Sequence, residues 1–197
     1  MSRPSIITLV GESGTGKSTL MSSLVVESGL FRILTSATTR APRSSDLRHE
    51  YRYLSDEEYG KIASNPKRFL WDVPAGNFGD RYAKDTLDVE EAFTDNEHVY
   101  INALIPSAAA ALVRLYGSEL IKTVYLESPG TDELRTRMLQ RGDDPEKVEE
   151  RLVIEKDEDW PDQLISLEGL VIITSQNLLV RQDAIHALVE FTDSLSE

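Results

Sequence analysis

GESGTGKST, residues 11–19, matches the phosphate-binding loop pattern G-x-x-x-x-G-K-[ST] at every fixed position. The apolar run at 6–10 before it predicts a buried strand, and the apolar spacing over 19–26 after it predicts a helix. In such a loop the glycines let backbone N–H groups turn toward phosphate oxygens, and the start of the helix adds its positive end. The stretch therefore predicts an α/β fold that opens with a strand, a polyphosphate site and a helix.

The loop also predicts which residues contact ATP and its metal ion. Lys17 is expected to reach the β- and γ-phosphates, and the Ser18 hydroxyl is expected to ligate Mg²⁺. The residues expected to bind the nucleotide are Gly11, Ser13, Gly14, Thr15, Gly16, Lys17, Ser18 and Thr19. The alternative is a turn rich in glycine and serine that matches by chance, which the flanking strand and helix disfavour. ATP and Mg²⁺ are the expected cofactors.

The composition of the 197 residues indicates one globular domain, because 40% hydrophobic residues are enough for a core. The chain has no cysteine, which excludes disulfides, a thiol nucleophile and cysteine-ligated metal. The three histidines, at 49, 98 and 186, are scattered and predict no metal cluster. A formal net charge of −13 predicts that nucleic acid is not a partner, since most of the surface would repel it. The same acidity would also suit a salty cytoplasm.

The N-terminal residues lead straight into the first strand, so no signal peptide is expected. No apolar stretch approaches the length of a membrane span. These features predict a cytoplasmic protein, monomer or homodimer, with no membrane partner.

Strand and helix patterns alternate along the chain, which predicts a parallel sheet with crossover helices. Ser55 and Glu58 form a capping-box pattern that starts a short helix, and 69–73 reads as a strand. The expected core strands, about five, lie at 6–10, 31–35, 99–104, 120–126 and 170–174. The other expected helices cover 85–93, 106–116, 131–141, 144–159 and 180–195. The core is expected at 1–34 and 86–197, with an acceptor-binding insertion at 35–85 and a lid at about 131–159.

Two arginines in the insertion can grip one phosphate from two directions. Arg40 and Arg43 are three residues apart and separated by a proline, and the planar guanidinium gives paired, charge-assisted hydrogen bonds. Tyr51 could add a hydroxyl donor. The alternative is an exposed basic loop in an acidic protein.

Three further arginines are expected in the lid. Arg137 and Arg141 are four residues apart on one helix, so they share a face, and Arg151 follows on the next helix. Phosphoryl transfer spreads negative charge over the equatorial oxygens, and arginines that close over it lower the barrier. The alternative is a set of surface salt bridges with nearby glutamates, which is the interpretation favoured for Arg135.

Taken together, the loop, the phrase S-x-T-T-R-x-P-R at 36–43, the segment 53–59 and the Arg141-Gly142 pair resemble the guanylate kinase family in order and spacing. The resemblance covers most of residues 5–175. It implies a three-layer P-loop kinase fold, an inserted acceptor subdomain, a helical lid, and transfer of the ATP γ-phosphate to GMP or dGMP. It also implies that Arg137, Arg141 and Arg151 are the lid arginines, and that the acceptor contacts are Ser36 for the guanine and Arg40, Arg43, Tyr51 and Tyr82 for the phosphate. Asp46 stands where the family usually has glutamate.

The chain departs from the family where the base is read. The family usually shows F-[IL]-E before a Gly-Asn turn, and that glutamate accepts the guanine N1 and N2 hydrogens. This chain has Phe69-Leu70-Trp71-Asp72, so Asp72 is the candidate replacement. The alternative is that Asp72 faces solvent while Phe69, Trp71 and Val73 alternate to the other side. The strand at 99–104 also lacks the family's aspartates, and Asn102 is its only polar side chain among apolar and aromatic ones.

Two other functions remain open at this point. A small phosphorylated acceptor other than GMP, such as ribose 1,5-bisphosphate or a modified nucleotide, would explain the altered base-reading residues. A non-catalytic interaction module is the third possibility, against which the intact Lys17 and Ser18 argue.

Overall fold

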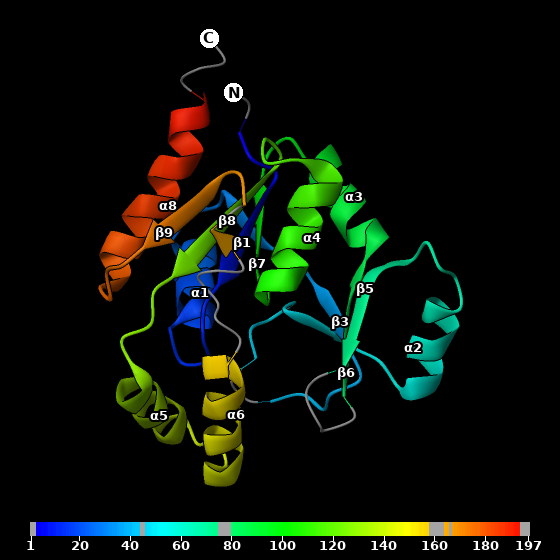
Figure 1. Ribbon diagram of the computed structural model, residues 1–197. Coiled ribbons are helices and arrows are strands. Elements are labelled where there is room, and N and C mark those ends of the chain that lie inside the picture. The colour runs from blue at the N-terminus through cyan, green and yellow to red at the C-terminus, as the bar shows by residue number, and fades with distance from the viewer. Residues whose placement is uncertain (1–2, 44–45, 75–79, 158–163, 166, 194–197) are drawn as a thin grey trace.

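A parallel sheet of five strands forms the centre of the core, in the order β2-β7-β1-β8-β9 (Figure 1). The computed structural model describes residues 3–43, 46–74, 80–157, 164–165 and 167–193. The core strands are β1 (Ile6–Val10), β2 (Phe31–Ile33), β7 (Val99–Ala103), β8 (Ile121–Leu126) and β9 (Leu170–Ile173). Every neighbouring pair runs parallel, so the predicted parallel core sheet of about five strands is confirmed.

Helices cover both faces of this sheet and complete the three layers. On one face Leu24 and Ile185 pack into the same buried cluster as Leu9, and on the other Leu112 packs with Ile6. Because both faces are buried, the strands are continuous apolar runs, which made them recognisable in the sequence. The first face carries α1 (Lys17–Glu27) and α8 (Leu178–Asp193), and the second carries α3 (Thr86–Thr94) and α4 (Pro106–Tyr116).

A second sheet of four strands lies beside the core, in the order β4-β3-β6-β5. Helix α2 (Asp56–Ala63) covers one face, where the buried Tyr59 packs against Ala37 and Ala83. The Ser55–Glu58 capping box is present as predicted. Three of the strands were not predicted, because runs of three to five residues are too short to show a period. The strands are β3 (Ser36–Thr38), β4 (Tyr51–Tyr53), β5 (Phe69–Pro74) and β6 (Arg81–Asp85).

An irregularity in β5 decides which of its side chains face α2. Phe69 lies opposite Asp85 and Trp71 lies opposite Lys84, so the register shifts between the two aromatic residues. Phe69 packs against Tyr59, with ring centroids 4.9 Å apart. Trp71 packs instead against the core cluster under α3 and α4. The expected alternation that put Phe69 and Trp71 on one side is therefore wrong.

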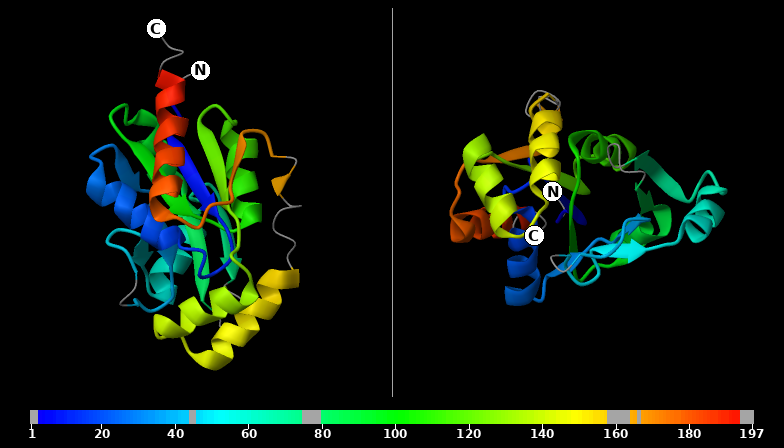
Figure 2. Two further views of the ribbon diagram at one scale, coloured as in Figure 1. Left: turned by 90° about the vertical axis from the view of Figure 1, so that its left-hand side faces the viewer. Right: turned by 90° about the horizontal axis from the view of Figure 1, so that it is seen from below.

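Two helices stand apart from the core sheet and pack on each other. α5 (Thr131–Gln140) and α6 (Pro145–Asp157) share a cluster of four buried side chains: Leu134, Met138, Val148 and Leu152. Seen from below, this pair lies on one side of the molecule and α2 on the other (Figure 2). Within the described ranges, no helix is long and apolar enough to cross a membrane.

Candidate active site

The phosphate loop joins the carboxyl end of β1 to the first turn of α1. Gly14 and Gly16 have φ angles of 86° and 95°, which side chains with a Cβ rarely adopt, so the turn requires glycine at both positions. Thr15 is fully buried, and its hydroxyl donates to the Glu12 carbonyl at 2.8 Å. On the other side Arg181 of α8 donates to the Thr15 carbonyl. Arg181 was missed because nothing local marks a helix residue that reaches back to a loop.

Lys17 lies folded over its own loop. Its Nζ donates to the Gly11 carbonyl at 2.5 Å and the Glu12 carbonyl at 3.0 Å. The pKa of Lys17 is lowered to about 8, mainly by burial; Glu155 opposes this effect, and Arg141 and Arg151 add to it. The lysine is thus a shielded cation placed among phosphate-binding groups, with the lid arginines within electrostatic reach.

Glu155 of α6 is bound to the same loop. Its carboxylate accepts from the Ser13 backbone N–H at 2.7 Å and from the Ser13 hydroxyl at 2.6 Å. The Glu155 carboxylate therefore accepts hydrogen bonds from two Ser13 groups in the loop that we expect to bind phosphate. This contact was not predicted from the sequence, because residues 142 positions apart leave no local signal.

The lid arginines divide into two groups. Arg137 donates to the Gly14 carbonyl at 3.3 Å and pairs with Glu133 at 2.9 Å, so it touches the phosphate loop. Arg141 and Arg151 both face Asp143, at 2.5 Å and 3.5 Å. Arg141 and Arg151 were predicted on separate helices. In the structure both contact the carboxylate of Asp143.

Arg135 behaves as a surface residue. It pairs with Asp132 at 2.7 Å and with Glu149 at 2.6 Å, so its interpretation as a salt-bridge arginine is confirmed.

Arg40 is the centre of the expected acceptor cluster. Its guanidinium is buried, donates to the Tyr82 hydroxyl at 2.8 Å, pairs with Asp46 at 2.9 Å and lies 5.0 Å from the centroid of the Tyr51 ring. Burial disfavours its charge, but the hydrogen bonds and charges of Asp46 and Tyr82 together outweigh this and hold the Arg40 pKa above its ordinary value. The structure therefore brings together four of the predicted residues, and it gives Arg40 a fixed orientation.

Asp46 stabilises the cluster of Arg40, Tyr51 and Tyr82 through several hydrogen bonds. Besides Arg40, its carboxylate accepts from the Arg43 backbone N–H at 2.6 Å and from the Tyr53 hydroxyl at 2.6 Å. Burial would raise the pKa of Asp46, but these hydrogen bonds lower it below the ordinary value. The Arg43 side chain is exposed, and its charge helps to lower the pKa of Asp143, so the acceptor cluster and the lid are within electrostatic reach.

Asp72 does not join the acceptor cluster. It lies opposite Ala83 in the register, on the face that α2 covers, accepts from the Tyr59 hydroxyl at 2.8 Å and pairs with Arg81. Ser36, Tyr82 and Trp71 lie on the opposite face. The placement of Asp72 with the other acceptor residues was wrong, because the bulge in β5 directs Trp71, not Asp72, to the acceptor side.

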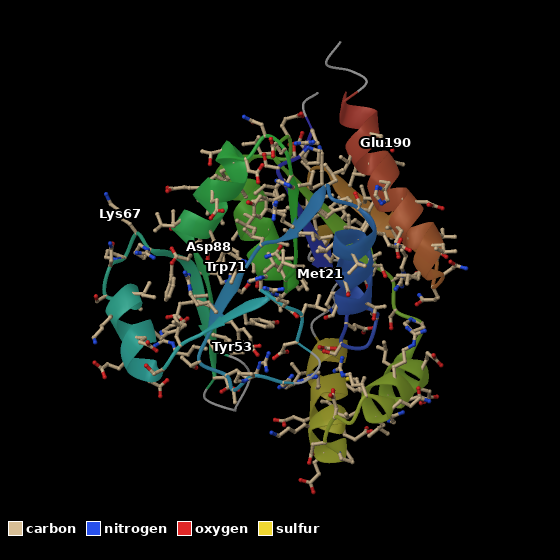
Figure 3. The ribbon with its side chains drawn as sticks, turned by 180° about the vertical axis from the view of Figure 1, so that it is seen from behind. Met21, Tyr53, Lys67, Trp71, Asp88 and Glu190 are labelled. Atoms are coloured by element: carbon tan, nitrogen blue, oxygen red, sulfur yellow. The ribbon has the colours of Figure 1, made fainter. Side chains whose placement is uncertain are left out.

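Lys84, which was not predicted, occupies that acceptor side. Its side chain is fully buried and donates to the Ser36 hydroxyl at 2.9 Å. Figure 3 labels Tyr53 and Trp71, which mark the strands at the two edges of this sheet.

The Ser18 hydroxyl is the one side-chain ligand that the sequence predicts for a metal ion in this loop. The described residues contain no group of three or more His, Asp or Glu that could hold a metal. Asn102, at the carboxyl end of β7, is 2% exposed, and neither polar atom of its side chain has a hydrogen-bond partner among the described residues. Mg²⁺ usually keeps several waters and shares substrate phosphates, so Ser18 together with an unpaired buried amide fits such an ion.

Comparison with known proteins agrees with this geometry. The family model for guanylate kinase matches residues 2–160. The guanylate kinase of Streptomyces coelicolor is 33% identical over 150 residues, which cover 76% of this chain and 73% of that protein. The guanylate kinase of Streptomyces kasugaensis is 33% identical over 156 residues, 78% of this chain and 73% of that protein.

The fold is also similar to that of a solved structure. The crystal structure of guanylate kinase from Anaplasma phagocytophilum matches with a TM-score of 0.66 at 18% identity, over 96% of this chain and 86% of that one. At this identity the match supports the P-loop kinase fold alone. On the family match and the curated relatives, the chain belongs to the guanylate kinase family.

Proposed function

We propose that this protein transfers the γ-phosphate of ATP to a nucleoside monophosphate, with GMP as the acceptor: ATP + GMP gives ADP + GDP. The observation that carries the proposal is the contact between the lid and the phosphate loop. Arg137 reaches the Gly14 carbonyl, and Arg141, Arg151 and Glu155 act on the charge of Lys17. Phosphoryl transfer needs positive charge around the transferred group, and Lys17 and these three arginines can supply it.

Catalysis rests on position and charge, with no covalent intermediate. An oxygen of the acceptor phosphate attacks the γ-phosphorus, and the bond from that phosphorus to the bridging oxygen breaks, which leaves ADP. Lys17 contacts the β- and γ-phosphates, while Arg137, Arg141 and Arg151 compensate the charge that develops on the transferred group. For this, Arg141 and Arg151 exchange Asp143 for phosphate oxygens.

The acceptor phosphate binds beside Arg40, Arg43, Tyr51 and Tyr82. Because Asp46 and Tyr82 fix the buried Arg40, its guanidinium needs little reorganisation when the phosphate arrives. The exposed Arg43 supplies the second, movable cation. The insertion that contains the second sheet serves as the acceptor subdomain, and the α5–α6 pair serves as the lid.

The Ser18 hydroxyl would hold Mg²⁺ beside the phosphates of ATP. When bound, the ion neutralises charge on the β- and γ-phosphates. The Asn102 amide, unpaired among the described residues, would be available to hydrogen-bond to a water of that ion.

A coupled assay of ADP release tests the proposal, with GMP, dGMP, AMP, UMP, dTMP and ribose 1,5-bisphosphate as separate acceptors. GMP and dGMP are expected to give the highest kcat/KM. ADP release that only the sugar phosphate stimulates would replace the proposal with the phosphosugar function. If no acceptor stimulates ADP release, the non-catalytic interaction module would be the remaining function.

A further inference from the structure

Lys84 is a buried cation at the junction between the core and the second sheet. Its exposed fraction is 0%, and its ammonium donates to the carbonyls of Leu34 at 3.0 Å and Thr35 at 2.7 Å, and to the Ser36 hydroxyl at 2.9 Å. Leu34 and Thr35 are the residues that join β2 to β3. Ser36 is half-buried, pairs with Tyr51 in the register, and lies on the same face of the sheet as Tyr82.

The number of donors fixes the direction of the Ser36 hydrogen. A protonated lysine has three N–H donors and no acceptor, and Lys84 has three partners. Two partners are carbonyls, which only accept, and the third is the Ser36 oxygen. Ser36 therefore accepts from Lys84 and has its own O–H left to donate elsewhere.

We propose that Lys84 sets the acceptor specificity of this kinase by holding the Ser36 hydroxyl as a donor toward a carbonyl oxygen of the acceptor base. The inference rests on the proposed function and names the chemistry that the site selects. Guanine and hypoxanthine carry a carbonyl at C6, which accepts this hydrogen bond. Adenine carries an amino group there, so a donor would face a donor.

On this face, the described residues of the three strands around Lys84 offer no charged acceptor for the other hydrogens of guanine. Among the described residues of β3, β5 and β6, the side chains on this face include no carboxylate, because Asp72 lies on the α2 side. Trp71, opposite Lys84 in the register, is apolar and packs against the core cluster under α3 and α4. We therefore expect the site to read the C6 carbonyl and to ignore the N2 amino group.

Two other charged groups act on Lys84. Asp88 of α3 favours its protonated form and Arg52 of β4 disfavours it, while burial is the largest effect and lowers its pKa to about 7. Trp71 and Asp88 are labelled in Figure 3, which shows the elements that enclose this junction. A neutral Lys84 has two N–H donors and one lone pair, so the two carbonyls would keep the donors and Ser36 would donate to the nitrogen. Ser36 would then present a lone pair to the acceptor.

The experiment measures kcat/KM for GMP, IMP and AMP in the wild type and in Lys84→Met, Lys84→Arg and Ser36→Ala. In the wild type at pH 6, where Lys84 is protonated, GMP and IMP are expected to agree within about fivefold, and AMP to be at least about 100-fold poorer. Lys84→Met and Ser36→Ala are each expected to reduce the ratio of GMP to AMP by about tenfold or more. Lys84→Arg keeps the charge and is expected to retain more of the ratio than Lys84→Met. Lys61→Met, an exposed lysine on α2, is the control and is expected to leave the ratio unchanged.

The pH dependence of the ratio distinguishes the proposed role of Lys84 in specificity from a purely structural role. In the wild type the ratio of GMP to AMP is expected to fall as the pH rises from 6 to 9, and in Lys84→Met it is expected to stay constant. If Lys84→Met and Ser36→Ala lower activity on all acceptors equally, the proposal is wrong while the kinase function stands. If GMP exceeds IMP by more than about 100-fold, a group that reads the N2 amine exists and the proposal is also wrong. If the wild type phosphorylates no nucleoside monophosphate, both fail.

Discussion

The carboxylate of Glu155 accepts two hydrogen bonds from Ser13, one from its backbone N–H at 2.7 Å and one from its hydroxyl at 2.6 Å. The two residues belong to the α6 helix and to the phosphate loop. Backbone N–H groups of such a loop bind phosphate oxygens, so Glu155 and the terminal phosphate of ATP compete for the same donors. The lid is thereby tied to the loop by a contact that nucleotide must displace.

Replacing Glu155 by glutamine is expected to strengthen ATP binding. The change removes a negative charge beside the triphosphate and weakens the contact that ATP displaces. A difference of about 1 kcal/mol corresponds to a fall of about fivefold in the KM for ATP. Steady-state kinetics with ATP varied at saturating acceptor measures it. Glu146→Gln, an exposed position on the same helix, is the control, and an unchanged or higher KM in Glu155→Gln would refute the competition.

Replacing Lys17 by alanine is expected to abolish turnover while the fold remains intact. Among the described residues, the side chain hydrogen-bonds to two carbonyls of its own loop, so its loss is expected to leave the core unchanged. Removal of a cation at the transferred phosphate typically lowers kcat by at least about 100-fold. Turnover and thermal unfolding are measured together, with Lys61→Ala as the control. A Lys17→Ala enzyme with near-normal kcat would remove the role assigned to the phosphate loop.

Replacing Arg43 by alanine is expected to weaken the acceptor and to spare ATP. The side chain is exposed and lies in the acceptor subdomain, so its loss costs little stability. One charge-assisted hydrogen bond contributes about 1.5–3 kcal/mol, which predicts a rise of about tenfold or more in the KM for GMP. Kinetics with each substrate varied in turn separate the two effects, and Arg114→Ala on α4 is the control. An effect confined to the KM for ATP would contradict the assignment.

Lys84 is expected to make the free energy of unfolding rise with pH. Burial lowers its pKa from 10.5 to about 7 in the folded state, so between these values the unfolded chain holds a proton that the folded chain lacks. The unfolded state then binds more protons, and stability increases with pH, by at most about 1.4 kcal/mol per pH unit for one proton. The energetic penalty of burying the charge is fully present below pH 7 and is relieved as the pH rises.

Urea unfolding at several pH values between 6.5 and 9.5 checks this expectation. The slope of stability against pH is expected to be smaller in Lys84→Met than in the wild type. Lys17 also has a lowered pKa, but it is present in both proteins and its contribution cancels. Identical slopes would show that Lys84 does not titrate in this range.

The core and the phosphate loop could be predicted because their signals are local. A strand buried on both faces is a continuous apolar run, and the loop at 11–18 has fixed glycines, a lysine and a hydroxyl at set positions. Arg40 and Arg43 were found from their spacing, and the structure places Arg40 with Tyr51 and Tyr82.

The second sheet and its chemistry could not be predicted, because they depend on pairing between distant segments. Strands β3 and β4 have three residues each, and β6 is a short, mostly polar segment without a strand pattern. The register shift between Phe69 and Trp71 turned Asp72 away from the acceptor side. Lys84 is unremarkable in the sequence and becomes a buried cation only because β6 pairs with β3.

The most direct test of the kinase function follows the phosphate itself. ATP labelled with ³²P at the γ position is incubated with the protein, Mg²⁺ and GMP, and the products are separated by chromatography. The label is expected to appear in GDP, at a rate that Lys17→Ala reduces to the background. Label that stays in ATP, or that appears only as inorganic phosphate, would contradict the conclusion that this protein phosphorylates GMP.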